Sequence, residues 1–159
     1  MKLTRYQEYH ESKEERLKKL YDIIGYPLRN QDISLCAITC SNFAKEYNEC
    51  KQDVIYEYDG LAVVGDAVLK AVISIHFFSP ELTEGYLTDR KKELESNASL
   101  QEIAYKLKID EVLFSSNTDL QGKKKMATAV EAIIGALYFS HGFEACQTFI
   151  KDKLLAGLL

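Results

Sequence analysis

Proline is scarce in this chain of 159 residues, with Pro27 and Pro80 as its two examples. Residues that favour helices dominate instead, a composition typical of α-rich globular domains. No stretch shows the sustained alternation of polar and apolar residues that marks a half-buried strand. We therefore predict an all-α fold with essentially no sheet.

Metal-binding cysteine pairs are also missing. The four cysteines form no CxxC pair, and the three histidines lie far apart in the sequence. This pattern argues against a zinc site and favours small buried thiols in a reducing compartment. No Ser-His-Asp or Cys-His spacing suggests nucleophilic catalysis.

The first 15 residues lack the apolar run of a signal peptide. We see no charge-free apolar stretch of the ~18 residues that a membrane span needs. No repeat, low-complexity segment or linker divides the chain. We therefore expect one cytoplasmic domain over residues 1–159, with its core over about 12–155 and no membrane partner.

A net charge of −4 argues against a protein that simply coats RNA, because such proteins are usually basic. It does not exclude an enzyme whose carboxylates hold metal ions, since those ions reverse the local charge. Apolar periodicity predicts helices over about 11–24, from near 32, 41–50, 54–78, 84–94, 99–107, 124–140 and 143–155. The helix over 54–78 is apolar on almost all sides, so we expect it to be central and buried.

Two carboxylates interrupt the two most apolar helices. Asp66 lies within LAVVGDAVLKAVI and Glu131 within MATAVEAIIGALYF. A buried charge is costly without a partner or a function, and two carboxylates on neighbouring helices could share Mg²⁺. The alternative is that each pairs with a lysine or caps a helix. Gly65 and Gly135 lie near the two acids and would permit the close approach of another helix or of a ligand.

Four segments in order resemble the ribonuclease III family. Residues 61–69 resemble its signature ERLEFLGDAVL, and residues 24–26 followed by 37–41 resemble its GY…ALTHSS stretch. Residues 94–100 resemble its LVSNxTL segment, and residues 131–138 its EALIGALY helix. Together these matches are highly specific. They imply an all-α, dimeric endonuclease domain.

The departures from the family pattern concern its metal ligands. The resemblance carries two of the four usual acids onto Asp66 and Glu131, whereas Ala62 and Thr128 stand at the other two positions. Asp59 replaces the first glutamate of the signature. The compact Mini-III ribonucleases have similar substitutions, reading LAYxGDA and STAFEALIG, and they cleave double-stranded RNA without an appended RNA-binding domain.

The resemblance therefore implies a metal-dependent nuclease with a reduced set of acids. Asp66 and Glu131 would bind Mg²⁺ or Mn²⁺, Thr128 could hold a metal-bound water, and Asp59 could orient water or a side chain. The spacings support this, because 59, 62 and 66 share one helix face, as do 128 and 131. The alternative is a catalytically degenerate relative that binds RNA or another subunit. A small helical adaptor is a more distant alternative.

Basic residues could contact phosphates at Lys123, Lys124 and Lys125, and along 90–92. Both runs could equally be solvated surface. Asn97 is a further candidate beside the RNA, although it could simply cap a helix. The family works as a two-fold dimer that cuts both strands of double-stranded RNA with a stagger. The resemblance thus implies a homodimer formed through the apolar signature helix. A heterodimer partner that supplies the missing acids is the alternative, and we expect no appended double-stranded-RNA-binding domain.

Overall fold

The computed structural model describes residues 4–116 and 123–156, and those ranges contain helices and no β-strand. The all-α prediction is confirmed. The elements in chain order are α1 (Arg5–Ile24), α2 (Gln31–Ala37), α3 (Ser41–Glu49), α4 (Asp59–Phe77), α5 (Glu84–Glu95), α6 (Asn97–Lys106), a 3-10 turn (Ile109–Glu111), α7 (Lys123–His141), α8 (Phe143–Phe149) and a π-helical continuation of α8 (Ile150–Leu155).

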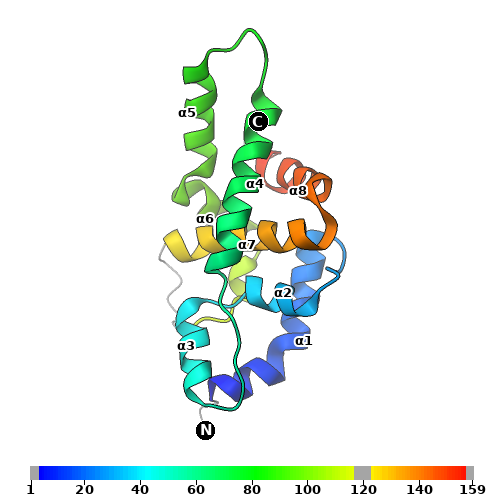
Figure 1. Ribbon diagram of the computed structural model, residues 1–159, viewed down its shortest axis with the longest axis vertical. Helices are drawn as coiled ribbons and strands as arrows, with labels where there is room; N and C mark the ends of the chain where they lie inside the picture. Colours follow the sequence, from blue (N-terminus) through cyan, green and yellow to red (C-terminus); the bar gives the residue numbers. More distant parts are fainter. Residues whose placement is uncertain (1–3, 117–122, 157–159) are drawn as a thin grey trace.

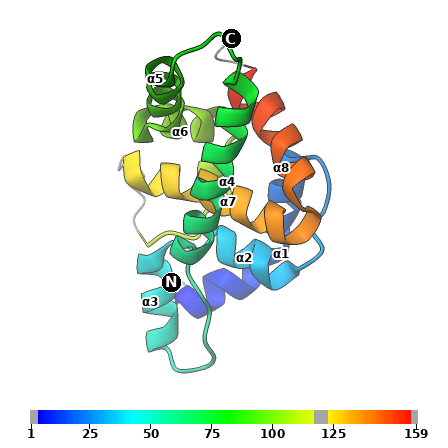
Figure 2. The same cartoon turned by 45° about the horizontal axis from the view of Figure 1, so that its top comes forward.

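Two long helices, α4 and α7, cross at the centre of the molecule (Figure 1). The helices α1, α2 and α3 gather at the end that carries the N-terminus. At the opposite end α5 lies beside α4, and α6 leads from it back to α7. The second view shows the same crossing, with α8 on the far side of α4 from α5 and α6 (Figure 2).

The enclosed helix is α7, whereas α4, which the sequence led us to expect as central and buried, is central but covered on one side. Most of α7 from Met126 to Leu137 is buried, because α2, α4, α6 and α8 all pack against it. In contrast, α4 keeps an open apolar face, on which Val63 is 72% and Ile75 is 55% exposed. A helix can therefore be apolar on all sides in sequence and still have one side that its own chain does not cover.

The helix α4 begins five residues later than periodicity suggested. The side chain of Asn48 pairs with the backbone of Ile55, accepting from its N–H at 2.9 Å and donating to its carbonyl at 3.1 Å. The N–H of Tyr58 donates to the carbonyl of Thr39 at 3.0 Å. These bonds hold the preceding segment in a non-helical path. The apolar residues at positions 54–58 therefore lie in a loop and not in the first turns of a helix.

Two other helices begin earlier than expected because of their capping residues. Thr4 and Gln7 form a reciprocal capping box that starts α1 at Arg5. The hydroxyl of Ser96 accepts from the N–H of Ser99 at 3.1 Å and starts α6 at Asn97. The helix expected from residue 99 therefore begins two residues earlier.

By length and composition alone, α4 is long and apolar enough to cross a membrane. The core helix of a soluble protein meets the same criterion. Here one side of α4 packs tightly on α7, and an ion pair between Asp66 and Lys70 lies near its middle. A charged pair of this kind is costly in the centre of a bilayer.

Candidate active site

Two glycines allow α4 and α7 to touch through their backbones. A Cβ on Gly65 would overlap the carbonyl oxygen of Glu131, and one on Gly135 would overlap the carbonyl oxygen of Leu61. Any side chain at either position would push the helices apart. This contact confirms the close approach expected from Gly65 and Gly135. It also brings Asp66, the residue after Gly65, close to Glu131.

Asp66 and Glu131 lie at the edge of the crossing and not deep in the core. The side chain of Asp66 is 37% exposed, and Glu131 is half buried. Lys70, one turn along α4, places its Nζ 2.9 Å from Oδ2 of Asp66. The alternative that a lysine pairs with the carboxylate is therefore observed for Asp66.

The charges around Glu131 form one electrostatic cluster. Burial, together with the negative charges of Asp66 and Glu95 and against the opposing effect of Lys70, raises the pKa of Glu131 to about 7. The hydrogen bond from Lys70 to Asp66 raises the pKa of the lysine, and Glu95 and Glu131 add to this shift. Four groups from three helices, α4, α5 and α7, therefore interact with one another.

Glu95 is the member of this cluster that the sequence analysis missed. It is the last residue of α5, and burial raises its pKa, with Asp66 adding to the shift and Lys91 and Lys70 opposing it. A signal was present in the sequence. Glu95 stands where the family segment LVSNxTL has valine, so a carboxylate replaces an apolar residue within the matched motif.

A second cluster lies two helical turns earlier on α4. Asp59 and Thr128 face a cavity of about 390 Å³ together with Lys124, Lys125, Ser41 and Tyr58. The hydroxyl of Tyr58 donates to the carbonyl of Lys125 at 3.3 Å, which fixes the start of α7 against α4. Along α4, Asp59 lies about 10 Å from Asp66, because the seven residue steps between them rise about 1.5 Å each.

The two positions that lack family acids are occupied in different ways. Ala62 is 7% exposed and packs into the core, so it offers no ligand. Thr128 donates its hydroxyl proton to the carbonyl of Lys124 at 2.7 Å. Its oxygen keeps lone pairs that could accept a hydrogen bond from water. This geometry is compatible with the role expected for Thr128.

The predicted RNA contacts fall into three groups. Lys124 is exposed and Lys125 is half buried beside Asp59, whereas the side chain of Lys123 lies outside the described part of the chain. Asn97 is exposed in the first turn of α6 and is not its cap. Arg90 lies over the Phe77 ring, 4.9 Å from its centroid, so it has a packing role in α5.

The donors in the Asp66 cluster suit a hard divalent cation, because they are carboxylate oxygens. Among the described residues, no three His, Cys, Asp or Glu side chains already converge on one metal position. Asp66 is turned toward Lys70, so its side chain would have to rotate before it could bind a cation together with Glu131. Oε1 of Glu95 is fully enclosed and has no hydrogen-bond partner among the described residues. An orphaned oxygen of this kind fits a site that takes a cation.

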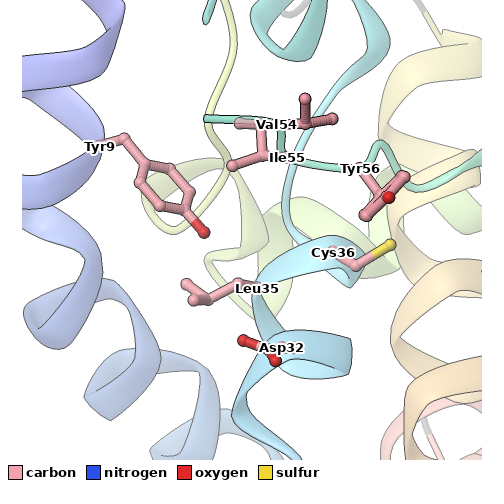
Figure 3. A pocket seen from close by; sticks show the side chains of 7 residues that line it. All are labelled: Tyr9, Asp32, Leu35, Cys36, Val54, Ile55 and Tyr56. Carbon is pink, nitrogen blue, oxygen red and sulfur yellow. The ribbon is translucent and has the colours of Figure 1, made fainter. Parts of the chain in front are cut away.

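A separate hollow of about 230 Å³ lies between α1, α2 and the segment before α4 (Figure 3). Burial raises the pKa of Cys36 to about 11, and its thiol donates to the carbonyl of Glu57 at 3.2 Å. Burial also raises the pKa of Tyr9 to about 12. Neither group is ionised near neutral pH, so neither offers a ready nucleophile.

Comparison with known proteins agrees with this geometry. The Ribonuclease-III-like family model matches residues 30–158. Ribonuclease 3 of Carboxydothermus hydrogenoformans is 38% identical over 143 residues, which cover 86% of this chain and 60% of that protein. Ribonuclease 3 of Bacillus licheniformis is 31% identical over 89% of this chain and 58% of that protein. The chain thus spans about three fifths of the length of these relatives.

Solved structures show the same fold. The nuclease domain of ribonuclease III from Campylobacter jejuni superimposes with a TM-score of 0.74 at 23% identity, over 89% of this chain and 95% of that one. A second structure of that domain, which shows flexibility in a region involved in dimer formation, has a TM-score of 0.74 at 25% identity, over 87% of this chain and 99% of that one. The chain belongs to the ribonuclease III family.

Proposed function

We propose that this chain is a divalent-metal-dependent endoribonuclease that makes staggered cuts in double-stranded RNA. The observation that supports this most strongly is the contact of Gly65 with the backbone of Glu131, which sets Asp66 and Glu131 side by side at the α4–α7 crossing. Both acids occupy positions where the family has metal ligands.

Asp66 and Glu131 would hold Mg²⁺ or Mn²⁺ between α4 and α7. When bound, such a cation neutralises charge on a phosphodiester and makes water more acidic. Thr128 can accept a hydrogen bond from water, while its proton stays on the carbonyl of Lys124. Asp59, at the start of α4, lies in the same cavity and can orient that water or the ammonium of a neighbouring lysine.

Lys124 and Lys125 provide positive charge beside Asp59 and Thr128. They face the cavity that contains Asp59 and Thr128, so a phosphate bound there would lie between the lysines and the proposed cation. Double-stranded RNA is recognised chiefly through its shape, phosphates and 2′-hydroxyls. We include Asn97, exposed in the first turn of α6, as a further contact on the RNA side.

The open apolar face of α4 supports a homodimer. It forms a groove of about 470 Å³ with Tyr138 and Phe143, in which Val63, Val64, Ala67, Val68 and Ala71 supply the α4 side. A second copy of the same chain, related by a two-fold axis, would cover this face with an identical one. It would also place two cutting centres on one duplex. We propose that this assembly acts in the cytoplasm, and the four free cysteines are compatible with a reducing compartment.

A non-catalytic relative is the second candidate, and one observation favours it. Asp66 is already paired with Lys70, and the neighbouring ligand position holds Ala62. A chain kept for RNA binding, or for pairing with a different subunit that supplies acids, would tolerate both features. Such a chain would bind RNA duplexes without a need for metal.

The experiment is cleavage of a labelled long RNA duplex in Mg²⁺, in Mn²⁺ and in chelator. The test variant is D66N, and D22N, at an exposed aspartate of α1, is the matched control. We expect metal-dependent cleavage by the unmodified chain and D22N, and a loss of at least ~100-fold in D66N. Binding of the duplex without cleavage in either metal would favour the non-catalytic candidate.

A further inference from the structure

The hollow of about 230 Å³ between α1, α2 and the segment before α4 combines apolar walls with a carboxylate (Figure 3). Leu35, Val54 and Ile55 supply aliphatic side chains, and the largely exposed ring of Tyr56 stands at its edge. Among the described residues that line it, Asp32 carries a negative charge and none is basic. This lining suits a ligand that has both an alkyl part and a positive charge.

Tyr9 directs an unpartnered hydroxyl into this hollow. The residue is 7% exposed, and Figure 3 shows its hydroxyl facing the centre of the hollow. The adjacent Tyr47, whose ring centroid lies 5.2 Å away, donates its hydroxyl proton to Asp53. The side-chain hydrogen bonds of the described residues include none to Tyr9. Buried polar groups usually have a hydrogen-bond partner, so this hydroxyl marks a position for a polar atom of a ligand.

The electrostatic environment of the hollow is negative. Asp32 lies in the first turn of α2, and no lysine or arginine of the described residues forms an ion pair with it. Burial raises the pKa of Tyr9, and the charges of Asp32 and Asp53 add to that shift. Surroundings of this sign repel an anion and attract a cation.

The lining favours an organic cation over a bare metal ion. A hard metal ion needs several oxygen ligands, whereas this hollow offers one carboxylate among aliphatic and aromatic side chains. An alkylammonium group matches it, because its N–H groups can donate to the Asp32 carboxylate and the Tyr9 oxygen. Its methylene groups can pack on Leu35 and Ile55. The Tyr56 ring, 75% exposed, can cover the positive charge through a cation–π contact.

We propose that this hollow binds an aliphatic ammonium ion of the diamine or polyamine class, held by Asp32 and the hydroxyl of Tyr9. Organic cations of this class gather around RNA, because its phosphates attract them as counterions. The lining includes no residue of α4 or α7, so the assignment does not depend on the proposed nuclease activity. A bound diamine would tie α1 and α2 to the segment that leads into α4.

The test titrates the protein with 1,4-diaminobutane by isothermal titration calorimetry at constant ionic strength. The matched ligand control is 1,4-butanediol, which has the same carbon chain and no charge. D32N removes the carboxylate charge, and it should fold because Asn30 caps α2. D89N, at an exposed aspartate of α5, changes the net charge equally and is the matched protein control. We expect D32N to weaken diamine binding roughly 10-fold or more, while D89N binds like the unmodified chain.

A second variant tests the hydroxyl. Y9F keeps the ring and should weaken diamine binding roughly 3-fold or more, because one hydrogen bond is lost. Its melting temperature without ligand should match or exceed that of the unmodified chain, since no described residue loses a bond to the hydroxyl. A lower melting temperature would mean that the hydroxyl already has a partner within the protein, and would count against the proposal. Circular dichroism confirms that each variant is folded.

The remaining outcomes decide the assignment. If the unmodified chain binds no diamine, or binds butanediol equally well, the hollow is not an ammonium site. If D32N and D89N weaken binding equally, the diamine responds to net charge and not to this hollow. Diamine binding that D32N and Y9F both weaken, and D89N does not, supports the site whether or not the chain cuts duplex RNA.

Discussion

The α-carbon of Gly65 packs against the carbonyl oxygen of Glu131, so closely that a methyl group at position 65 would overlap that oxygen. This contact sets the separation of α4 and α7 beside the two candidate ligands, Asp66 and Glu131. The geometry of the site and the packing of the core therefore depend on the same pair of residues. A change at Gly65 should affect both.

The substitution G65A should destabilise the protein by about 2–4 kcal/mol, because the added methyl meets backbone atoms that cannot move aside alone. Urea denaturation followed by circular dichroism measures this loss. G60A is the control within the same helix, since a Cβ there meets nothing within 4 Å. It should be neutral or stabilising by up to about 1 kcal/mol. Equal effects of the two substitutions would contradict the close contact at 65.

The raised pKa of Glu131 predicts how the stability of the metal-free protein depends on pH. Its folded value of about 7 lies above the ordinary 4.5, so the folded state holds the proton more tightly than the unfolded chain. Ionisation of Glu131 therefore costs nothing near pH 4, costs progressively more between about 4.5 and 7, and costs a constant amount above 7.

The variant E131Q removes this cost. In chelator, we expect E131Q to match the unmodified protein near pH 4.5 and to exceed its unfolding free energy by on the order of 1 kcal/mol at pH 8, a value reduced for the half-exposed side chain. Urea denaturation at the two pH values gives the difference. E144Q, at an exposed position of α8, should show no comparable change between them. A constant difference between E131Q and the unmodified protein would contradict the prediction.

The open face of α4 predicts a dimer that a single charge disrupts. Val63 is 72% exposed in the isolated chain and lines the apolar groove. V63K would place an ammonium group inside the proposed interface, and the dimer dissociation constant should rise at least ~10-fold. Sedimentation equilibrium measures this constant for each variant.

The matched control is V54K, because Val54 is 63% exposed but lies in the segment before α4, away from the groove. V54K should associate like the unmodified protein. A monomer at all concentrations in the unmodified protein would contradict the homodimer and leave the face of α4 without its proposed partner. Equal weakening by both variants would mean that the interface lies elsewhere.

Several features of the site could be predicted from particular residues. Asp66 and Glu131 were evident because charges are costly within apolar helices, and Gly65 and Gly135 indicated that those helices come close together. The apolar helices led us to expect that Asp66 and Glu131 are more deeply buried than they are. A helix that is apolar on all sides looks buried in sequence, but the apolar surface of α4 that faces outward leaves Asp66 at an open edge.

Long-range contacts account for what the sequence analysis missed. The start of α4 depends on Asn48, which holds Ile55 in a loop, and no local pattern reveals a bond between residues seven apart in a non-helical segment. Glu95 could be noticed as an acid in an apolar family position. Its role could not be inferred, because its closeness to Glu131 requires α5 to fold back along α4.

The sequence by itself determined the helical class, the family and the two acids at the crossing, because these depend on local periodicity and on the chemistry of single residues. Only the tertiary structure decided which helix is enclosed, that Lys70 holds Asp66, and that Glu95 joins the cluster. These features depend on how helices distant in the chain meet. Electrostatic interactions act through space, so the acidic cluster exists only once α4, α5 and α7 have packed together.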